Sequence, residues 1–199
     1  MIKLTNLDSS TPFIIFKNLY DSAISNNQTA IEAIVISSFN NNLEEVESRF
    51  VNLKYINESE LIFFSNYDGP KGSQFSENPK VSALLYWNSI NTQIRIKATI
   101  KKTDQDFSDT HFQNRSAEKN ALAISSKQSE VIDSYDSVIK NYEKTLNNSQ
   151  DLFTRPNYWG GYSLKPYYFE FWVGNKSRLN KRDVYKLDSG YWSHSILQP

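Results

Sequence analysis

The segment of residues 92–103 constrains the fold most, because its side chains alternate between apolar and polar along its length. Polar residues, beginning with Gln93, lie between four apolar ones, which are Ile94, Ile96, Ala98 and Ile100. Alternation with a period of two is typical of a strand that buries one face and exposes the other. The sequence therefore predicts a sheet that has one face against a hydrophobic core.

Further segments have the composition of strands, because β-branched and aromatic residues are enriched in them and turn residues separate them. They are residues 30–39, 46–55, 60–67, 81–88, 167–173, 183–187 and 191–197. Three asparagines at 40–42 offer turn chemistry between the first two segments, which predicts a hairpin there.

Helices are predicted before and between these strands. Pro12 follows the potential capping residue Thr11, and apolar residues then recur at helical spacing through residues 13–23. Further helices are predicted at residues 108–115 and 129–147, with another helical stretch between them, and the helix at 129–147 has one apolar stripe. Strands on both sides of a helical stretch favour an α+β, mainly β fold, with helices packed outside a barrel.

Length and composition set limits on function. A chain of 199 residues fits one domain. Its 22 basic residues balance 22 acidic ones, so nucleic acid is not an expected partner. With no cysteine and only two histidines, no metal site is expected. We found neither a secretory signal nor a segment long and apolar enough for a membrane span, so we expect a cytoplasmic protein without membrane contact.

Basic residues are the remaining chemical feature, because the glycine-rich phosphate loops and nucleophile motifs of common enzyme classes are absent. They lie near the ends of predicted elements, at Arg49, Lys54, Lys71, Arg115, Lys119, Arg178 and Arg182. Arginine offers a fork and lysine a point charge to a phosphate, so these residues are candidates for phosphate binding. On the pattern alone, solvated surface charge is the more common explanation of such residues.

Whole strings of the sequence resemble the pyridoxamine 5'-phosphate oxidase family, from about Ala30 to the last residue. The strings are Arg49-Phe-Val-Asn-Leu-Lys54, Phe63-Phe-Ser-Asn66, Asn78-Pro79, Gln93-Ile-Arg95-Ile, Lys127-Gln-Ser129, Pro156-Asn-Tyr-Trp-Gly-Gly161, Glu170-Phe-Trp172-x-Gly174, Arg178-Leu, Arg182 and Leu197-x-Pro199. The resemblance implies an FMN-binding split β-barrel with flanking helices. It also implies a homodimer that holds two FMN molecules at the subunit interface.

The resemblance also implies an organisation and an activity. The single domain, 1–199, would comprise an N-terminal helix within 1–29, a helical insertion at 105–150 and C-terminal strands at 165–199 that contribute to the dimer interface. Such enzymes oxidise pyridoxine or pyridoxamine 5'-phosphate to pyridoxal 5'-phosphate, with FMN and then oxygen accepting the electrons. The expected substrate is therefore a small phosphorylated aromatic molecule.

Site residues follow from the same resemblance, position by position. The positions that match FMN contacts are Arg49, Phe50, Val51, Leu53, Lys54, Phe64, Ser65, Lys71, Gln93, Gln128, Ser129, Trp172 and Arg182. The positions that match substrate contacts are Lys54, His111, Arg115, Lys119, Arg178 and Asn180, with Arg178 also the catalytic candidate that covers the ring. Arg49 and Lys54 are expected on opposite faces of a regular strand, and hence on different phosphates.

The chain departs from the family pattern at several of these positions. Gly69-Pro70 replaces a usual Ser-Arg, His111 a tyrosine and Lys119 a serine, while Asn180 replaces a histidine that can titrate near neutral pH. Three hypotheses stay open. The chain is a vitamer phosphate oxidase, an FMN oxidoreductase of the same fold with another anionic aromatic substrate, or a non-catalytic module that binds flavin or pyridoxal phosphate.

Overall fold

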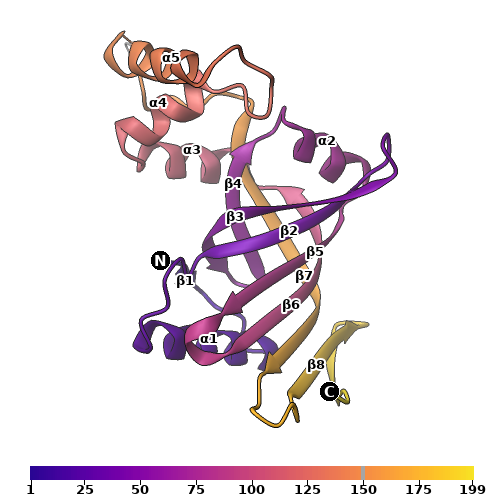
Figure 1. The fold of residues 1–199 in the computed structure, drawn as a ribbon. Helices are drawn as coiled ribbons and strands as arrows, with labels where there is room; N and C mark the ends of the chain where they lie inside the picture. The colour runs from indigo at the N-terminus through magenta and orange to yellow at the C-terminus, as the bar shows by residue number, and fades with distance from the viewer. Residues whose placement is uncertain (149–150) are drawn as a thin grey trace.

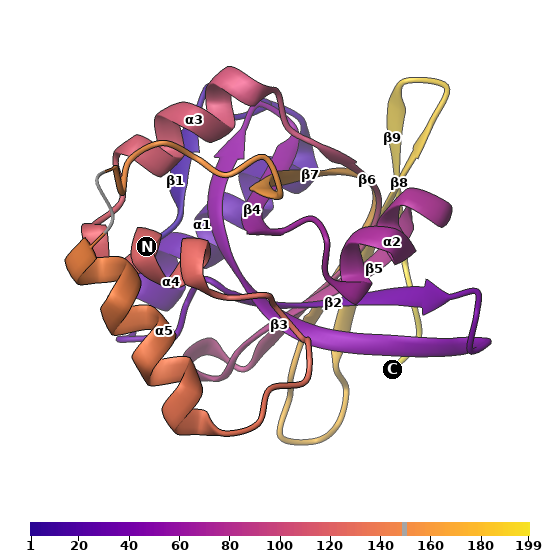
Figure 2. The same cartoon turned by 90° about the horizontal axis from the view of Figure 1, so that it is seen from above.

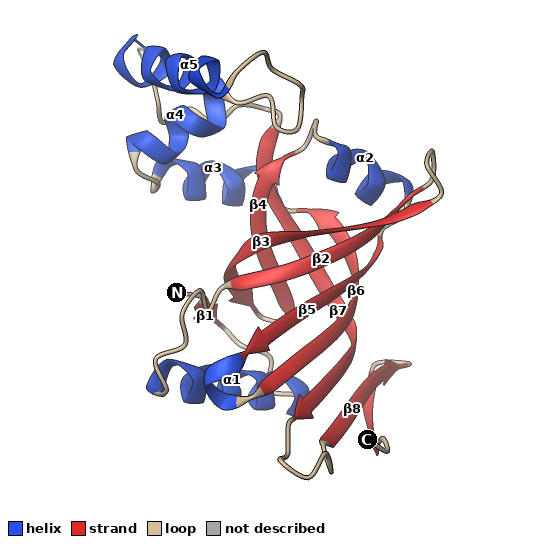
Figure 3. Ribbon diagram, in the orientation of Figure 1, coloured by secondary structure: helices blue, strands red, loops and turns tan. Residues whose placement is uncertain are grey.

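The structure is a computed structural model that describes residues 1–148 and 151–199. Six antiparallel strands close into a barrel in the order β3-β2-β5-β6-β7-β4, and β4 pairs with β3 to complete the ring (Figures 1 and 3). These strands are β2 (Ala33–Asn40), β3 (Glu45–Asn57), β4 (Glu60–Asn66), β5 (Lys80–Trp87), β6 (Thr92–Lys102) and β7 (Trp159–Val173). A mainly β barrel with flanking helices was the predicted fold class, and it is confirmed.

Three more strands extend the sheet beyond the barrel. The short β1 (Lys3–Thr5) runs parallel to the end of β3. The strands β8 (Lys181–Asp188) and β9 (Tyr191–Ile196) continue antiparallel from β7 and lie away from the barrel, where the chain ends (Figures 1 and 2). The C-terminal hairpin is therefore joined to the barrel through β7.

Helices lie at both ends of the barrel (Figure 1). Helix α1 (Thr11–Ser25), which has Pro12 in its first turn, lies at one end. The other end carries α2 (Pro70–Glu77), α3 (Gln105–Gln113), α4 (Ala117–Ser125) and α5 (Tyr135–Asn148). A short 3-10 helix (Asn88–Ile90) connects β5 to β6. Seen from above in Figure 2, α3, α4 and α5 lie on one side of the barrel and α2 on the other.

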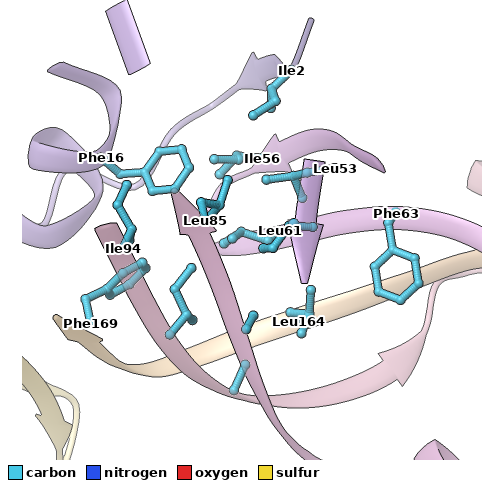
Figure 4. Close-up of a cluster of buried hydrophobic side chains, with 14 of the residues drawn as sticks. Ile2, Phe16, Leu53, Ile56, Leu61, Phe63, Leu85, Ile94, Leu164 and Phe169 are labelled. Atoms are coloured by element: carbon cyan, nitrogen blue, oxygen red, sulfur yellow. The ribbon is translucent and has the colours of Figure 1, made fainter. Parts of the chain in front are cut away.

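The core fills the barrel interior and the contact with α1 (Figure 4). The four apolar residues of the alternating segment, Ile94, Ile96, Ala98 and Ile100, are each at most 3% exposed. Aromatic rings join the helix to the barrel, because Phe16 of α1 packs edge to face on Trp87 at 5.5 Å between centroids. Burial of such rings contributes on the order of 2 kcal/mol each, so α1 is held mainly by apolar packing.

Several predicted boundaries were wrong. Strand β1 was not predicted, and the predicted helix from Ser129 begins only at Tyr135. Strand β7 begins at Trp159 rather than residue 167. At Gly160 and Gly161 a Cβ would collide with the side chains of Tyr67 and Thr103, which therefore pack directly against the backbone of the strand. Residues 149 and 150 of the predicted insertion, 105–150, lie outside the described residues.

Among the described helices, none combines the length and the apolar character that a membrane crossing requires.

Candidate functional site

The site begins where two barrel strands diverge. Strand β4 pairs with β3 only from Leu53 to Asn57, and a bulge interrupts this register after Leu53. Strand β4 pairs with β7 from Leu61 to Asn66, so its residues 64–66 pair with β7 alone. The edge of β3 that precedes Leu53 is therefore open, and a cavity of about 740 Å³ lies against it.

Five parts of the chain line this cavity. They are the open stretch of β3, the middle of β4, the start of α2, the start of β7 and the region of α3 and α4 with the loop that follows α4. The lining residues are Glu47, Ser48, Arg49, Phe50, Val51, Asn52, Lys54, Phe64, Ser65, Pro70, Lys71, His111, Arg115, Lys119, Gln128, Ser129 and Trp159. Most of the predicted cofactor and substrate residues are thus brought together.

The open edge of β3 presents backbone groups to the cavity. The Leu53 N–H donates to Glu32 O at 2.8 Å, on the side of β2. In an antiparallel pair, backbone groups alternate between the two edges of a strand, so those of Asn52 and Phe50 point away from β2. The side chain of Leu53 lies in the core and is 0% exposed, and its N–H is engaged on the β2 side, so Leu53 is not brought to the predicted cofactor site.

One end of the cavity combines Lys71 with uncharged polar groups. The Lys71 ammonium donates to Gln128 Oε1 at 2.6 Å, and the Ser65 hydroxyl donates to the same oxygen at 3.1 Å. Burial, with a smaller contribution from the positive charge of Arg49, lowers the pKa of Lys71. The amide partner does not offset the charge of this buried ammonium, so the end of the cavity favours an anion.

Arg49 is held beside this end by a polar network. Its guanidinium donates to Ser38 Oγ at 2.6 Å, to Gln74 Oε1 at 3.0 Å and to Glu47 Oε2 at 3.1 Å. The Gln74 amide in turn donates to Glu47 Oε1 at 2.9 Å. These contacts fix the guanidinium at the cavity wall before any ligand binds.

The other end of the cavity is built around Arg115. Its guanidinium lies over the Trp159 ring, 4.3 Å from the centroid, and Nη2 donates to Lys119 O at 2.9 Å. Nη1 is buried and has no hydrogen-bond partner within the described part of the chain. Burial lowers the pKa of Arg115 to about 10, so the group remains charged at neutral pH. A buried, unpartnered cationic donor beside a cavity fits an anionic ligand.

His111 lies at the same end. Its ring stacks on Phe64 with centroids 3.6 Å apart, and its Nδ1 lies 2.9 Å from the Tyr55 hydroxyl. Burial, then the positive charges of Arg115 and three lysines, lowers the pKa of His111 to about 4. His111 is therefore neutral at pH 7 and can take part only as an uncharged donor or acceptor.

A second group of predicted residues lies elsewhere. Gln93, Trp172 and Arg182 are direct neighbours on β6, β7 and β8. The Arg182 guanidinium donates twice to Glu170 Oε1, at 2.8 and 2.9 Å, and Arg95 donates to Oε2 at 2.8 Å. Glu170 is 1% exposed, so a buried carboxylate holds both guanidinium groups.

Arg178 and Asn180 belong to the loop that joins β7 to β8. Arg178 is exposed and has a φ of 62°, a left-handed conformation that is strained for a residue with a Cβ. Asn180 Oδ1 accepts a hydrogen bond from the Asn175 N–H at 3.0 Å, which closes the loop. The acceptor of the Asn180 amide is therefore already engaged, and its NH₂ group is the part left for a ligand.

Within one copy of the chain, the residues that line the cavity lie far from the second group of predicted residues. Trp159 lines the cavity at the start of β7, whereas Trp172 lies near the end of this 15-residue strand. At about 3.3 Å per residue, such a strand spans roughly 45 Å. Gln93, Trp172, Arg178, Asn180 and Arg182 are therefore remote from the cavity of their own copy.

Some residues of the site were not predicted. Glu47 and Gln74 accept hydrogen bonds from the Arg49 guanidinium. Glu170 accepts from the Arg182 guanidinium, and the Trp159 ring packs against the Arg115 guanidinium. Glu47 lies two residues before Arg49 on one strand, a spacing that places both on the same face and could have identified the pair. Gln74 and Trp159 meet their partners only through the fold.

The prediction that Arg49 and Lys54 face different ligands depended on a regular strand. Both residues line the same cavity. The bulge after Leu53 and the divergence of β4 place the cavity along the edge of β3, where side chains from both faces reach it. The alternation of side chains between the two faces of β3 was therefore the wrong reason for assigning Arg49 and Lys54 to different ligands.

Comparison with known proteins gives two family matches that cover most of the chain. Residues 33–147 match the model described as "Pyridoxamine 5'-phosphate oxidase". Residues 159–199 match the model described as "Pyridoxine 5'-phosphate oxidase C-terminal dimerisation region". The second match contains Trp172, Arg178, Asn180 and Arg182, and the first contains most of the cavity.

Curated relatives agree along nearly the whole length. A pyridoxine/pyridoxamine 5'-phosphate oxidase of Rhodopirellula baltica is 34% identical over 200 residues, which cover 96% of this chain and 88% of the relative. The oxidase of the same description in Pelagibacter ubique is 32% identical, with 97% of this chain and 94% of the relative covered.

Solved structures share the fold. PhzG from Burkholderia lata, in complex with tetrahydrophenazine-1-carboxylic acid, superposes with a TM-score of 0.89 at 25% identity and covers 96% of this chain and 93% of its own. A pyridoxamine 5'-phosphate oxidase-related, FMN-binding protein from Nostoc punctiforme gives 0.79 at 14% identity, with 96% of this chain and 99% of its own covered. The second likeness concerns the fold alone.

Proposed function

This chain belongs to the pyridoxamine 5'-phosphate oxidase family, and we propose that it is an FMN-dependent oxidase that forms pyridoxal 5'-phosphate. Its substrates would be pyridoxamine or pyridoxine 5'-phosphate, with oxygen as the acceptor and the cytoplasm as its location. The observation that carries the proposal is one cavity with a cationic side chain at each of its two ends, Lys71 and Arg115. A flavin phosphate and a substrate phosphate need two such ends.

The residues at the first end fit FMN. Lys71 is a buried cation with an uncharged partner, and Arg49 is fixed beside it. Helix α2 starts there without a side-chain cap. Pro70 has no N–H and the Gly72 N–H donates to Gly69 O at 2.7 Å, so within the first turn the Lys71 N–H is the group that would serve an anion. Acceptance of a hydride and transfer of electrons to oxygen are the chemistry that FMN supplies when bound. Lys71 and Arg49 would hold its phosphate, while Gln128 and the open edge of β3 would bind its polar groups.

The substrate phosphate is assigned to the second end. Arg115 Nη1 is a buried donor without a partner in the described structure, and Lys54, Lys119 and the His111 ring line the same region. The stacked rings of Phe64 and Trp159 exclude water from one side, which strengthens charge interactions there. This chain would thus bind the phosphate with two lysines, one arginine and a neutral histidine.

The remaining site residues would come from a second copy of the chain. The match of residues 159–199 to a dimerisation region supports a homodimer. Gln93, Trp172 and Arg182 would then complete the flavin site of the partner, and Glu170 would keep Arg182 oriented. Arg178, on its exposed loop, would cover the ring of the substrate bound in the other copy. A homodimer of this kind explains why the cavity residues and the residues of β6, β7 and β8 lie apart within one copy.

A second candidate is an FMN oxidoreductase that acts on another anionic aromatic molecule. The observation in its favour is Asn180, whose oxygen is engaged by Asn175 and which cannot titrate near neutral pH. The structurally similar PhzG is in complex with tetrahydrophenazine-1-carboxylic acid, an anionic ring compound at neutral pH. If only this position has drifted, Asn180→His should raise activity on the vitamer phosphates.

Substrate turnover separates the candidates. The protein loaded with FMN is given pyridoxamine 5'-phosphate, pyridoxine 5'-phosphate or unphosphorylated pyridoxamine, and both aldehyde formation and oxygen consumption are followed. We expect turnover of the phosphates and little of the free amine. A flavin-loaded protein that turns over neither phosphate would eliminate the first candidate and favour the second.

A further inference from the structure

We propose that Tyr55 is a positioning residue, whose hydroxyl fixes His111 as the neutral tautomer with its hydrogen on Nε2, so that His111 donates to the anionic group of the ligand. The inference deepens the proposed function, because it concerns the phosphate end of the same cavity. It depends on the contacts of two side chains, Tyr55 and His111, that both come from this chain.

Contacts fix the His111 ring from two sides. Phe64 stacks on its face at 3.6 Å between centroids and an interplanar angle of 10°. The Tyr55 ring meets it edge to face at 5.4 Å and 79°, with the hydroxyl 2.9 Å from Nδ1. His111 lines the cavity, whereas Tyr55 is not among the lining residues. Since Nδ1 faces Tyr55, the edge that carries Nε2 is the one left for a ligand.

The proton assignment follows from the hydrogen-bonding capacity of the pair. Burial raises the pKa of Tyr55, so its hydroxyl stays protonated at neutral pH. Within the described structure, the hydrogen bond found for this hydroxyl is the one to His111. A hydroxyl that donates to Nδ1 makes that nitrogen an acceptor, and the neutral imidazole then carries its hydrogen on Nε2.

Several cations keep His111 neutral. Arg115 follows α3, Lys54 extends from β3, Lys3 from β1 and Lys119 from α4, and all of them lower the pKa of His111 together with burial. A phosphate anion bound between these groups would offset their charge and raise that pKa. Ligand binding between about pH 4.5 and 6 should therefore be accompanied by proton uptake at His111.

The tautomer can be measured without turnover or substrate. The sequence has two histidines, His111 and His194, so ¹⁵N spectra of the imidazole nitrogens contain two sets of signals, and His111→Gln assigns them. We expect one protonated nitrogen, Nε2, for His111 at pH 7, and a mixture of tautomers in Tyr55→Phe. A hydrogen on Nδ1, a doubly protonated ring at pH 7, or an unchanged pattern in Tyr55→Phe would overturn the proposal.

Ligand binding tests the second half of the proposal in the FMN-loaded protein. We expect Tyr55→Phe to weaken binding of inorganic phosphate about fivefold, the scale of one hydrogen bond, and to raise KM for pyridoxamine 5'-phosphate without lowering kcat. Tyr20→Phe is the matched control, because the Tyr20 hydroxyl bonds to Ile2 at the opposite end of the barrel. Equal phosphate affinity in the two variants would overturn the role of Tyr55.

Proton uptake gives an independent measurement. Calorimetric titration with inorganic phosphate at pH 5.5, in two buffers of different ionisation enthalpy, reports the protons taken up on binding. The wild-type protein should take up more protons than His111→Gln, and equal uptake would overturn the coupling. Failure to oxidise the vitamers would refute the proposed function alone, since the phosphate and tautomer measurements involve no turnover.

Discussion

The carboxylate of Glu170 accepts two hydrogen bonds from the guanidinium of Arg182, with Oε1 2.9 Å from Nε and 2.8 Å from Nη2. The other oxygen accepts from Arg95 at 2.8 Å and from the Tyr168 hydroxyl at 2.9 Å. A carboxylate that is 1% exposed requires such partners, because a buried charge without them costs several kcal/mol. Glu170 therefore orients Arg182 on the surface that we assign to the partner's flavin site.

Glu170→Gln should damage both the fold and the cofactor site. Two guanidinium groups would lose their charged partner, so we expect the free energy of unfolding to fall by about 3 kcal/mol and FMN to bind less tightly. Urea unfolding and quenching of flavin fluorescence measure the two effects. Lys101→Gln is the control, since the Lys101 side chain that pairs with Glu60 is 65% exposed and such a pair contributes less than about 1 kcal/mol.

Lys71→Met should make the FMN-free protein more stable and should weaken its binding of FMN. The folded protein lowers the pKa of Lys71 by burial, so the charged form destabilises the folded state at neutral pH. That cost is fully present below the lowered pKa and disappears as the pH rises toward 10.5, the ordinary value. We expect the variant without FMN to have a higher Tm at pH 7, with a smaller gain at alkaline pH.

The same variant should bind FMN about 10- to 100-fold more weakly, because a charge-assisted contact to the phosphate is lost. Lys80→Met, which alters an exposed lysine at the start of β5, should change neither quantity. Unchanged FMN affinity in Lys71→Met would contradict the assignment of this end of the cavity to the flavin phosphate.

Lys54→Ala should weaken substrate binding, whereas Arg182→Ala should weaken FMN binding. Lys54 lies toward the Arg115 end, so its loss should raise KM for pyridoxamine 5'-phosphate several-fold while FMN stays bound. Arg182→Ala should lose FMN first and activity as a consequence. Steady-state kinetics at saturating FMN, together with the flavin content of the purified variants, measures this order. The reverse order would show that the two phosphates are wrongly assigned.

Mixed dimers test whether two copies share a site. Lys71 lies in the cavity and Arg182 in the remote group, so a dimer of one Lys71→Met chain with one Arg182→Ala chain keeps one intact site of two. Random mixing of the two chains should restore about a quarter of the FMN sites. Trp172→Ala mixed with Arg182→Ala should restore none, because both changes affect the same group. No recovery in the first mixture would refute the shared site.

Periodicity predicted the barrel where a strand is regular. The alternation at residues 92–103 corresponds to β6, and its four apolar residues are in the core. It failed at β3, because a bulge and the divergence of β4 allow Arg49 and Lys54 to reach one cavity. Neither feature has a local sequence signal, since both depend on the pairing of distant strands.

The resemblance to a family predicted most of the cavity residues but not the residues that hold them. Arg49 and Arg115 were identified as ligand contacts, whereas Gln74 and Trp159, which fix them, meet them only in the folded chain. Tyr55 also carried no signal, because its role depends on His111, 56 residues further along the chain. Contacts of this kind require the three-dimensional structure.

The central claim is that this chain holds FMN and reduces it with a phosphorylated vitamer. The most direct measurement is the visible spectrum of the purified, FMN-supplied protein before and after anaerobic addition of pyridoxamine 5'-phosphate. The account predicts a yellow protein whose flavin absorbance is bleached by the substrate and returns when oxygen is admitted. A protein that stays colourless in excess FMN, or whose bound flavin is not bleached, would contradict it.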